Sequence, residues 1–213
     1  MIQGKIVNYD GQKIYIIAEY GDIEKYTLKK YERANIELID GRGISRKQQK
    51  SIYALLRDIS LYTGYTPEEI KQIMKYDFLA KYGGEMFSLA SVDMTTAREF
   101  QTHLIEFVLK NDIPCSVNLL EEADDIGKYI YMCLIYKKCC ISGKKSELHH
   151  VDSIGMGRNR NEVTHIGMRA MPLSRKYHNE VHTIGQQSFN KKYHVFGVKI
   201  DEVIASKYKQ IKE

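Results

Sequence analysis

Residues 139–185 read CCISGKKSELHHVDSIGMGRNRNEVTHIGMRAMPLSRKYHNEVHTIG, and this stretch decides the fold of the C-terminal part. It contains two adjacent histidines, His149 and His150, and a later pair, His178 and His182. Residues four apart lie one above the other on a helix, so the later pair can present two imidazoles to one metal ion. Imidazole binds several first-row divalent ions, so the spacing indicates a metal without selecting it. A pair of this spacing is also common on a solvated helix face.

The tandem histidines follow an apolar and polar alternation that predicts a short strand. Glu147 and Leu148 precede them and Val151 follows, before a loop that contains two glycines and two arginines. Successive side chains of a strand point to opposite faces, and only a bend or bulge lets neighbours act at one site. One histidine can therefore bind a ligand while the other works beside it.

This order of strand, loop and helix resembles the HNH endonuclease family, which has the ββα-metal fold, and the likeness includes residues 172–178, PLSRKYH. The resemblance implies that His149, His178 and His182 hold one divalent metal ion, which is Mg, Mn, Ni or Zn. It implies that His150 is the general base for phosphodiester hydrolysis, a role that suits an imidazole near neutral pH. The expected DNA contacts in this part are Arg158, Arg160, Arg169 and Lys176.

Many members of that family also bind a structural zinc through two pairs of Cys or His ligands. The corresponding pairs here read Cys139-x-x-Ser142 and Ser174-x-x-Tyr177, which leaves one thiolate of four ligands. We therefore expect no structural zinc and a fold that is stabilised by packing.

The family's middle Asn is also missing, because the position nine residues before His178 is Arg169. Asn159, Asn161 and His165 lie nearby in the sequence and remain alternatives for its role.

Charge is divided unevenly along the chain. Residues 1–127 carry 16 Lys and Arg against 20 Asp and Glu, whereas residues 128–213 carry 16 against 7. A concentrated positive field favours a polyanionic partner such as DNA, although a basic solvated face with no ligand is the alternative. The acidic cluster at 121–125 marks the expected boundary between a domain at 1–125 and a domain at 128–213 with a C-terminal extension.

The N-terminal half begins with expected strands at 2–8, 13–19 and 34–40, bounded by Asn, Asp and Gly turn signals. Helices follow. The first starts at Ser45 and ends at Gly64, the second starts with the N-cap Thr66 followed by Pro67, and a third is expected to start with a capping box at Thr96.

Residues 34–120 resemble a second family, the phage lambda Orf (NinB-like) recombination mediators. The likeness lies in residues 45–60, SRKQQKSIYALLRDIS, in the helix after Thr66, in an expected strand at 87–89 and in a last helix that opens at 94–96. It implies a homodimeric DNA-binding protein that acts beside single-strand-binding protein. The alternative is a solvated helix start with Tyr53 in packing. The residues implied to face DNA are Arg46, Lys47, Gln48, Lys50 and Tyr53.

The fold class expected is therefore α+β, with a small β/helical DNA-binding domain followed by a ββα-metal domain. The expected function is a phage-type DNA recombination or processing nuclease that cuts single-stranded or branched DNA. A mediator whose HNH module binds without cutting, and a metal-stabilised regulatory DNA-binding protein, are the alternatives. No apolar run approaches the roughly 20 residues that cross a bilayer, so we expect no membrane partner and a place in the host-cell cytoplasm.

Overall fold

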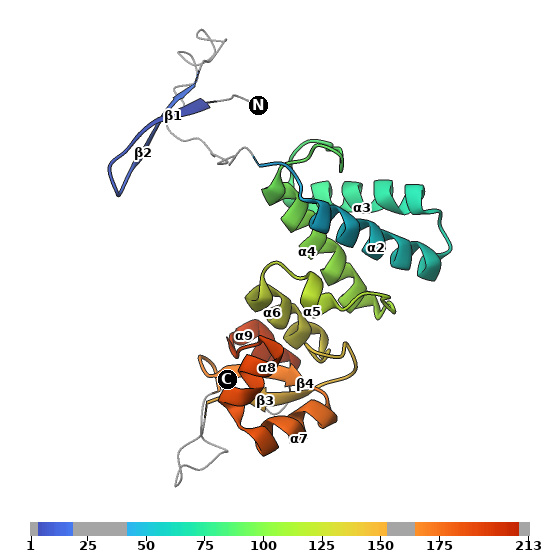
Figure 1. Cartoon of the computed structure of the whole chain (residues 1–213), viewed down its shortest axis with the longest axis vertical. Helices are drawn as coiled ribbons and strands as arrows, with labels where there is room; N and C mark the ends of the chain where they lie inside the picture. Colours follow the sequence, from blue (N-terminus) through green and yellow to red (C-terminus); the bar gives the residue numbers. More distant parts are fainter. Residues whose placement is uncertain (1–3, 19–41, 153–164, 209–213) are drawn as a thin grey trace. The chain divides into compact units, whose positions relative to one another are not determined.

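The computed structural model describes residues 4–18, 42–152 and 165–208, and it forms two compact units, Met1–Leu38 and Ile39–Glu213. Helices and small sheets occur together, which confirms the α+β class (Figure 1). The boundary expected near residue 125 falls inside the second unit, so separate folding of the two halves stays a prediction.

The described part of the first unit is an antiparallel hairpin of β1 (Gly4–Tyr9) and β2 (Ile14–Ala18). Its turn is held by the Asp10 carboxylate, which accepts hydrogen bonds from the backbone N–H groups of Gln12 and Lys13 at 3.0 and 2.7 Å. The first two expected strands are thereby confirmed. The strand expected at 34–40 lies outside the described residues.

The second unit opens with α2 (Arg46–Thr63) and α3 (Pro67–Tyr82), and both begin with capping boxes. Ser45 and Gln48 form the first box, and Thr66 and Glu69 form the second. Each box satisfies backbone N–H groups that a helix start otherwise leaves unpaired. α2 ends at Gly64 with φ 81°, the left-handed conformation that favours glycine. Both helix starts are as the sequence predicts.

The third helix, α4 (Met94–Asn111), starts earlier than expected. Its N-cap is Asp93, whose carboxylate accepts a hydrogen bond from the backbone N–H of Thr96 at 2.9 Å. The capping box expected at Thr96 is therefore wrong, because the helix already begins at Met94 and Asp93 caps the backbone N–H of Thr96 itself. Thr96 lies inside the first turn.

The strand expected at 87–89 is also wrong, since residues 83–89 form no strand. This segment instead follows the helices with its backbone groups bound to their side chains. The Lys75 ammonium donates to the Phe87 carbonyl at 2.7 Å, and the Gln49 amide donates to the Leu89 carbonyl at 3.0 Å. These bonds replace the ladder partners that a strand would need.

The acidic segment at residues 121–125 forms hydrogen bonds with helices α2 and α4. It contains the short α5 (Leu119–Glu122) and leads into α6 (Ile126–Tyr136), whose N-cap is Asp125. Asp124 accepts a hydrogen bond from the Gln48 amide at 2.9 Å, and the Glu122 carbonyl accepts one from Gln101 at 2.7 Å. The segment is therefore packed against α2 and α4.

A three-stranded antiparallel sheet forms the rest of the unit, in the order β3 (Glu147–His150), β4 (Arg169–Leu173) and β5 (Val198–Lys199). Three helices accompany it: α7 (Arg175–Ile184), α8 (Gln186–Tyr193) and α9 (Glu202–Lys207). α7 packs on β3 and β4, while α6 packs on β4, α4 and α9 (Figure 1). Helix α6 thus links the helical part to the sheet.

One hydrophobic core runs through the second unit. It contains Ile52 and Phe100 from the helical part, Tyr129 and Leu134 from α6, and Phe189 beside the sheet. All five are buried. Within the residues that the structure describes, no helix is long and apolar enough to cross a membrane.

Candidate active site

Strand β3 carries both tandem histidines. His149 pairs with Met171 of β4 and is 5% exposed, whereas His150, the last residue of the strand, pairs with Ala170 and is half-buried. Their side chains leave the strand on opposite faces. A bend follows His150 directly.

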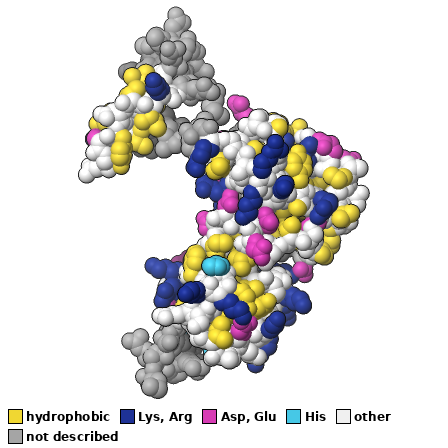
Figure 2. Space-filling view, in the orientation of Figure 1, with side chains coloured by type: hydrophobic (Ala, Val, Ile, Leu, Met, Phe, Trp, Pro, Cys, Tyr) yellow, Lys and Arg dark blue, Asp and Glu magenta, His cyan; other side chains and the backbone are white. Residues whose placement is uncertain are grey.

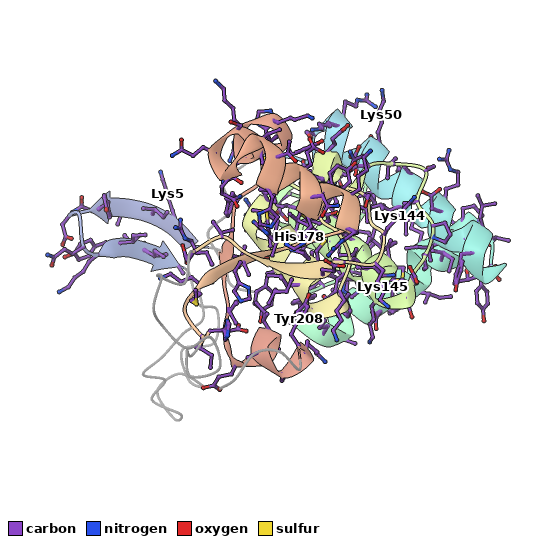
Figure 3. All side chains as sticks on the ribbon, turned by 90° about the horizontal axis from the view of Figure 1, so that it is seen from below. Lys5, Lys50, Lys144, Lys145, His178 and Tyr208 are labelled. Atoms are coloured by element: carbon purple, nitrogen blue, oxygen red, sulfur yellow. The ribbon has the colours of Figure 1, made fainter. Side chains whose placement is uncertain are left out.

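Helix α7 brings the other two histidines to His149. The centroids of the His178 and His182 rings lie 4.9 Å apart, and that of His149 lies 5.0 Å from His178 and 5.3 Å from His182. One nitrogen from each ring lies within 4.8 Å of the other two, close enough to hold a single metal ion. Figure 3 labels His178, which lies among the side chains between the sheet and α7. The three histidines named as metal ligands from the sequence are thus brought together.

The outer nitrogens of two of these rings have polar partners. His178 Nδ1 lies 3.3 Å from a carboxylate oxygen of Glu147, which also pairs with Arg175 at 3.1 Å. His149 Nε2 lies 2.9 Å from the side-chain oxygen of Gln186. Such partners orient metal-binding histidines. Sequence reasoning missed both residues. A signal existed for Glu147, because it lies two residues before His149 on the same face of a strand.

The pKa values of His149 and His178 favour the neutral form. Burial lowers the pKa of His149, and the nearby His178 and His182 lower it further, while its hydrogen bond to Gln186 acts in the opposite direction. Burial is also the main cause that lowers the pKa of His178. A neutral imidazole has the free electron pair that a metal ion needs. The donor set therefore fits a divalent ion at neutral pH.

His150 contacts a second buried histidine. Its Nε2 lies 2.9 Å from Nδ1 of His165, which is 7% exposed. Burial, then the nearby His165 and His149, lowers the pKa of His150. His165 is one of the three alternatives for the missing Asn, and Asn159 and Asn161 lie outside the described residues. A neutral, hydrogen-bonded His150 has the form that a general base requires.

A comparison with known protein families matches residues 12–211 to a family described as "Putative HNHc nuclease". The chain belongs to this family. The HNH interpretation is therefore confirmed at the level of a nuclease family, and the match extends well beyond residues 139–185. No curated protein and no solved structure matches the chain. The likeness of residues 34–120 to the Orf mediators stays a prediction.

This HNHc family member carries an ion pair at the position of the missing Asn. The Arg169 guanidinium donates to the Asp152 carboxylate at 2.6 and 2.9 Å, and the Arg169 backbone N–H donates to the other carboxylate oxygen at 2.6 Å. The Arg169 carbonyl accepts from Val151 at 2.8 Å. These bonds hold the C-terminal end of β3 against the N-terminal end of β4, next to His150. A DNA contact by Arg169 stays a prediction, and its charge is already shared with Asp152.

Cys139 is the one cysteine at the positions of the family's structural zinc. Cys139 is buried, and the turn that it begins is closed by backbone hydrogen bonds from Cys139 to Lys144 at 2.6 Å and from Gly143 to Cys139 at 2.8 Å. Burial raises the pKa of Cys133 to about 12 and that of Cys140 well above its usual range. These two thiols stay protonated at neutral pH. The absence of a structural zinc stays a prediction.

The residues expected to contact DNA differ in how exposed they are, and two of them lie outside the described residues. Arg158 and Arg160 lie outside the described residues. Lys176 is exposed at the start of α7, with its ammonium 5.3 Å from the centre of the Tyr177 ring. Gln48 is 6% exposed, and its side chain is bound to Ser45 and Asp124, so a DNA contact by Gln48 stays a prediction that would need these bonds to break.

The remaining four expected contacts lie on the surface of α2: Arg46, Lys47, Lys50 and Tyr53. Figure 2 shows Lys and Arg side chains among acidic and apolar ones on one face of the second unit. A long positive groove is not visible on this face. DNA binding by α2 would therefore use a local patch.

Proposed function

We propose that this HNHc family member is a metal-dependent DNA endonuclease that hydrolyses phosphodiester bonds. The convergence of His149, His178 and His182, with one nitrogen of each ring within 4.8 Å of the others, carries the proposal. These side chains would hold one divalent ion, Mg, Mn, Ni or Zn. An ion bound there would neutralise the scissile phosphate and stabilise the leaving oxygen.

His150 is the proposed general base. When its Nε2–H donates to His165, the free electron pair of Nδ1 can take a proton from water. The resulting hydroxide attacks phosphorus, the bond from phosphorus to the leaving oxygen breaks, and that oxygen acquires a proton from solvent. The lowered pKa of His150 keeps the ring neutral and able to accept this proton at neutral pH.

The proposed substrate is single-stranded or branched DNA, and the proposed setting is phage-type recombination or DNA processing. This finer assignment rests on the Orf resemblance together with the basic residues at the start of α2. Homodimerisation and contact with single-strand-binding protein rest on the same resemblance and stay predictions.

A cleavage assay tests the proposal directly. The full chain is incubated with single-stranded, duplex and branched DNA in the presence of Mg, Mn, Ni or Zn, and products are resolved on denaturing gels. We expect metal-dependent cutting that chelation abolishes. Absence of cutting on every substrate with every ion would overturn the endonuclease proposal.

A second candidate function is a recombination mediator that binds single-stranded DNA and does not cut it. Two surface hollows beside Tyr53 favour it, one of about 520 Å³ next to Lys50 and Arg57 and one of about 440 Å³ next to Lys71 and Phe87. Tyr53 itself is 46% exposed. An exposed aromatic ring among cations is the arrangement on which unpaired bases stack. Binding without cleavage in the same assay would select this function.

A further inference from the structure

The two ring nitrogens of His149 face different partners. Nε2 lies 2.9 Å from the Gln186 side-chain oxygen, which leaves Nδ1 as the nitrogen without a protein hydrogen bond among the described residues. His149 is also the most buried of the three clustered histidines, and the only one supplied by the sheet. The hydrogen bond that this ring makes is to Gln186 of α8, while its contacts with α7 are ring packing against His178 and His182.

The orientation of the Gln186 amide is fixed by a second contact. Its side-chain nitrogen donates to the Asn190 side-chain oxygen at 2.7 Å, one turn further along α8. The amide oxygen is consequently the atom that faces His149. Gly185, with φ 81°, makes the bend between α7 and α8 that places Gln186 here, and a residue with a side chain would be strained in that conformation.

An amide oxygen only accepts hydrogen bonds. His149 must therefore donate from Nε2, and in the neutral ring the free electron pair is then on Nδ1. His178 shows the opposite arrangement, because its Nδ1 faces the Glu147 carboxylate at 3.3 Å and its Nε2 carries the free pair. These contacts thus leave Nδ1 of His149 and Nε2 of His178 as the nitrogens with a free electron pair.

We propose that Gln186 is a positioning residue that fixes the tautomer of His149, so that this histidine binds the metal ion through Nδ1. The inference rests on the proposed metal site for its consequence, but the tautomer itself is a property of the metal-free protein. Gln186 holds the ring, Asn190 holds Gln186, and the backbone bend at Gly185 brings both residues to the sheet.

The first test measures the tautomer without any metal. Long-range ¹H–¹⁵N NMR spectra of the metal-free full chain distinguish a protonated Nε2 from a protonated Nδ1 in each histidine. We expect His149 to be protonated on Nε2 in the wild type and in Gln186→Glu, which keeps an acceptor, and to become a mixture in Gln186→Leu. A wild-type His149 protonated on Nδ1 would overturn the inference.

The second test measures Zn²⁺ and Mn²⁺ affinity by calorimetric titration of the same proteins. Loss of an outer partner of a ligating histidine typically weakens binding by about 10- to 100-fold, and we expect that loss in Gln186→Leu and not in Gln186→Glu. Gln187→Leu is the matched control, because Gln187 is the exposed neighbour of Gln186 on the same helix.

The outcomes separate this inference from the proposed function. Wild-type protein that binds neither ion would overturn the metal site, while the NMR result would still decide the tautomer. Wild-type protein that binds an ion, together with equal or tighter binding by Gln186→Leu, would overturn the positioning role and leave the metal site intact.

Discussion

Nε2 of His150 lies 2.9 Å from Nδ1 of His165, with His165 buried and His150 half-buried. Their centroids are 4.8 Å apart and their planes are inclined at 49°. Two imidazoles in this contact share one hydrogen, so the tautomer of one ring dictates that of the other. A base oriented by a third group is a recurring arrangement in hydrolytic sites.

Replacing His165 should slow cleavage and leave metal affinity unchanged. His165→Phe keeps a ring but removes the acceptor, so His150 loses its fixed orientation. We expect a loss of about tenfold or more, below the roughly 10²–10⁴ that a positioned base contributes in full. His165→Asn restores an acceptor and should recover part of the rate. Equal single-turnover rates for the wild type and His165→Phe would exclude the orienting role.

The tandem histidines should separate binding from chemistry. His150→Ala is expected to retain metal and DNA binding but to lose on the order of 10²–10⁴ in cleavage rate. His149→Ala should weaken both metal affinity and cleavage, because one of three protein ligands is lost. Calorimetry and single-turnover kinetics under matched salt decide this. The opposite pattern would show that the two roles are interchanged.

His178→Ala should abolish divalent-metal binding at this site without unfolding the chain. The ring is only partly buried, with 22% of the side chain exposed, so its loss leaves a small defect in packing. Calorimetry measures the affinity, and circular dichroism checks the helices. The control is His194→Asn, since His194 is exposed and lies outside the cluster. Unchanged affinity in His178→Ala would remove it from the ligand set.

Local signals in the sequence predicted the start and end of α2 and the start of α3. The boxes at Ser45 and Thr66 involve residues three apart, so the sequence alone contains both partners. The error at Thr96 arose because two capping signals overlap, and only the structure shows that Asp93 accepts the hydrogen bond. The strand expected at 87–89 failed because its backbone groups bind side chains of α2 and α3, which are distant in sequence.

In the candidate site too, residues joined by a local spacing or a family motif could be predicted, whereas contacts between distant segments could not. A helical spacing of four placed His178 and His182 together, and the HNH resemblance added His149 and His150. The contacts of Gln186 and His165 could not be derived, because they join elements 37 and 15 residues apart in the chain. A glutamine at the first position of a helix has no motif, and its role depends on the bend at Gly185.

Stability should fall as the solution becomes acidic, through His103. Its side chain is 5% exposed, and burial lowers its pKa; Asp77 and Glu106 oppose this shift, while Lys81 adds to it. Its Nε2 lies 3.0 Å from Asp77 Oδ2, yet neither ring nitrogen makes a well-directed hydrogen bond. Because the folded pKa is below the unfolded value, the stabilisation is present above about pH 6.5 and is lost as pH falls towards the folded pKa.

His103→Phe provides the comparison, since the ring already packs edge-on against Phe78 and Tyr82. The difference in unfolding free energy between wild type and variant should change by at most about 1.4 kcal/mol per pH unit below pH 6.5. Urea unfolding at several pH values measures it. Parallel curves would show that other groups cause the acid sensitivity.

The exposed start of α2 should contribute to single-stranded DNA binding through both charge and stacking. Arg46, Lys47 and Lys50 are exposed along one helix, and Tyr53 continues the same surface at 46% exposure. Each lost phosphate contact should reduce the slope of log affinity against log salt by about 0.7, so Lys47→Glu combined with Lys50→Glu should lower it by up to about 1.4.

Tyr53→Ala should weaken binding by about 1–3 kcal/mol per stacked base with little change in slope. Lys110→Glu, an exposed lysine on α4, is the charge control. Fluorescence anisotropy across a salt series measures all four proteins, and wild-type affinity and slope in every variant would exclude the start of α2 as a DNA-binding surface.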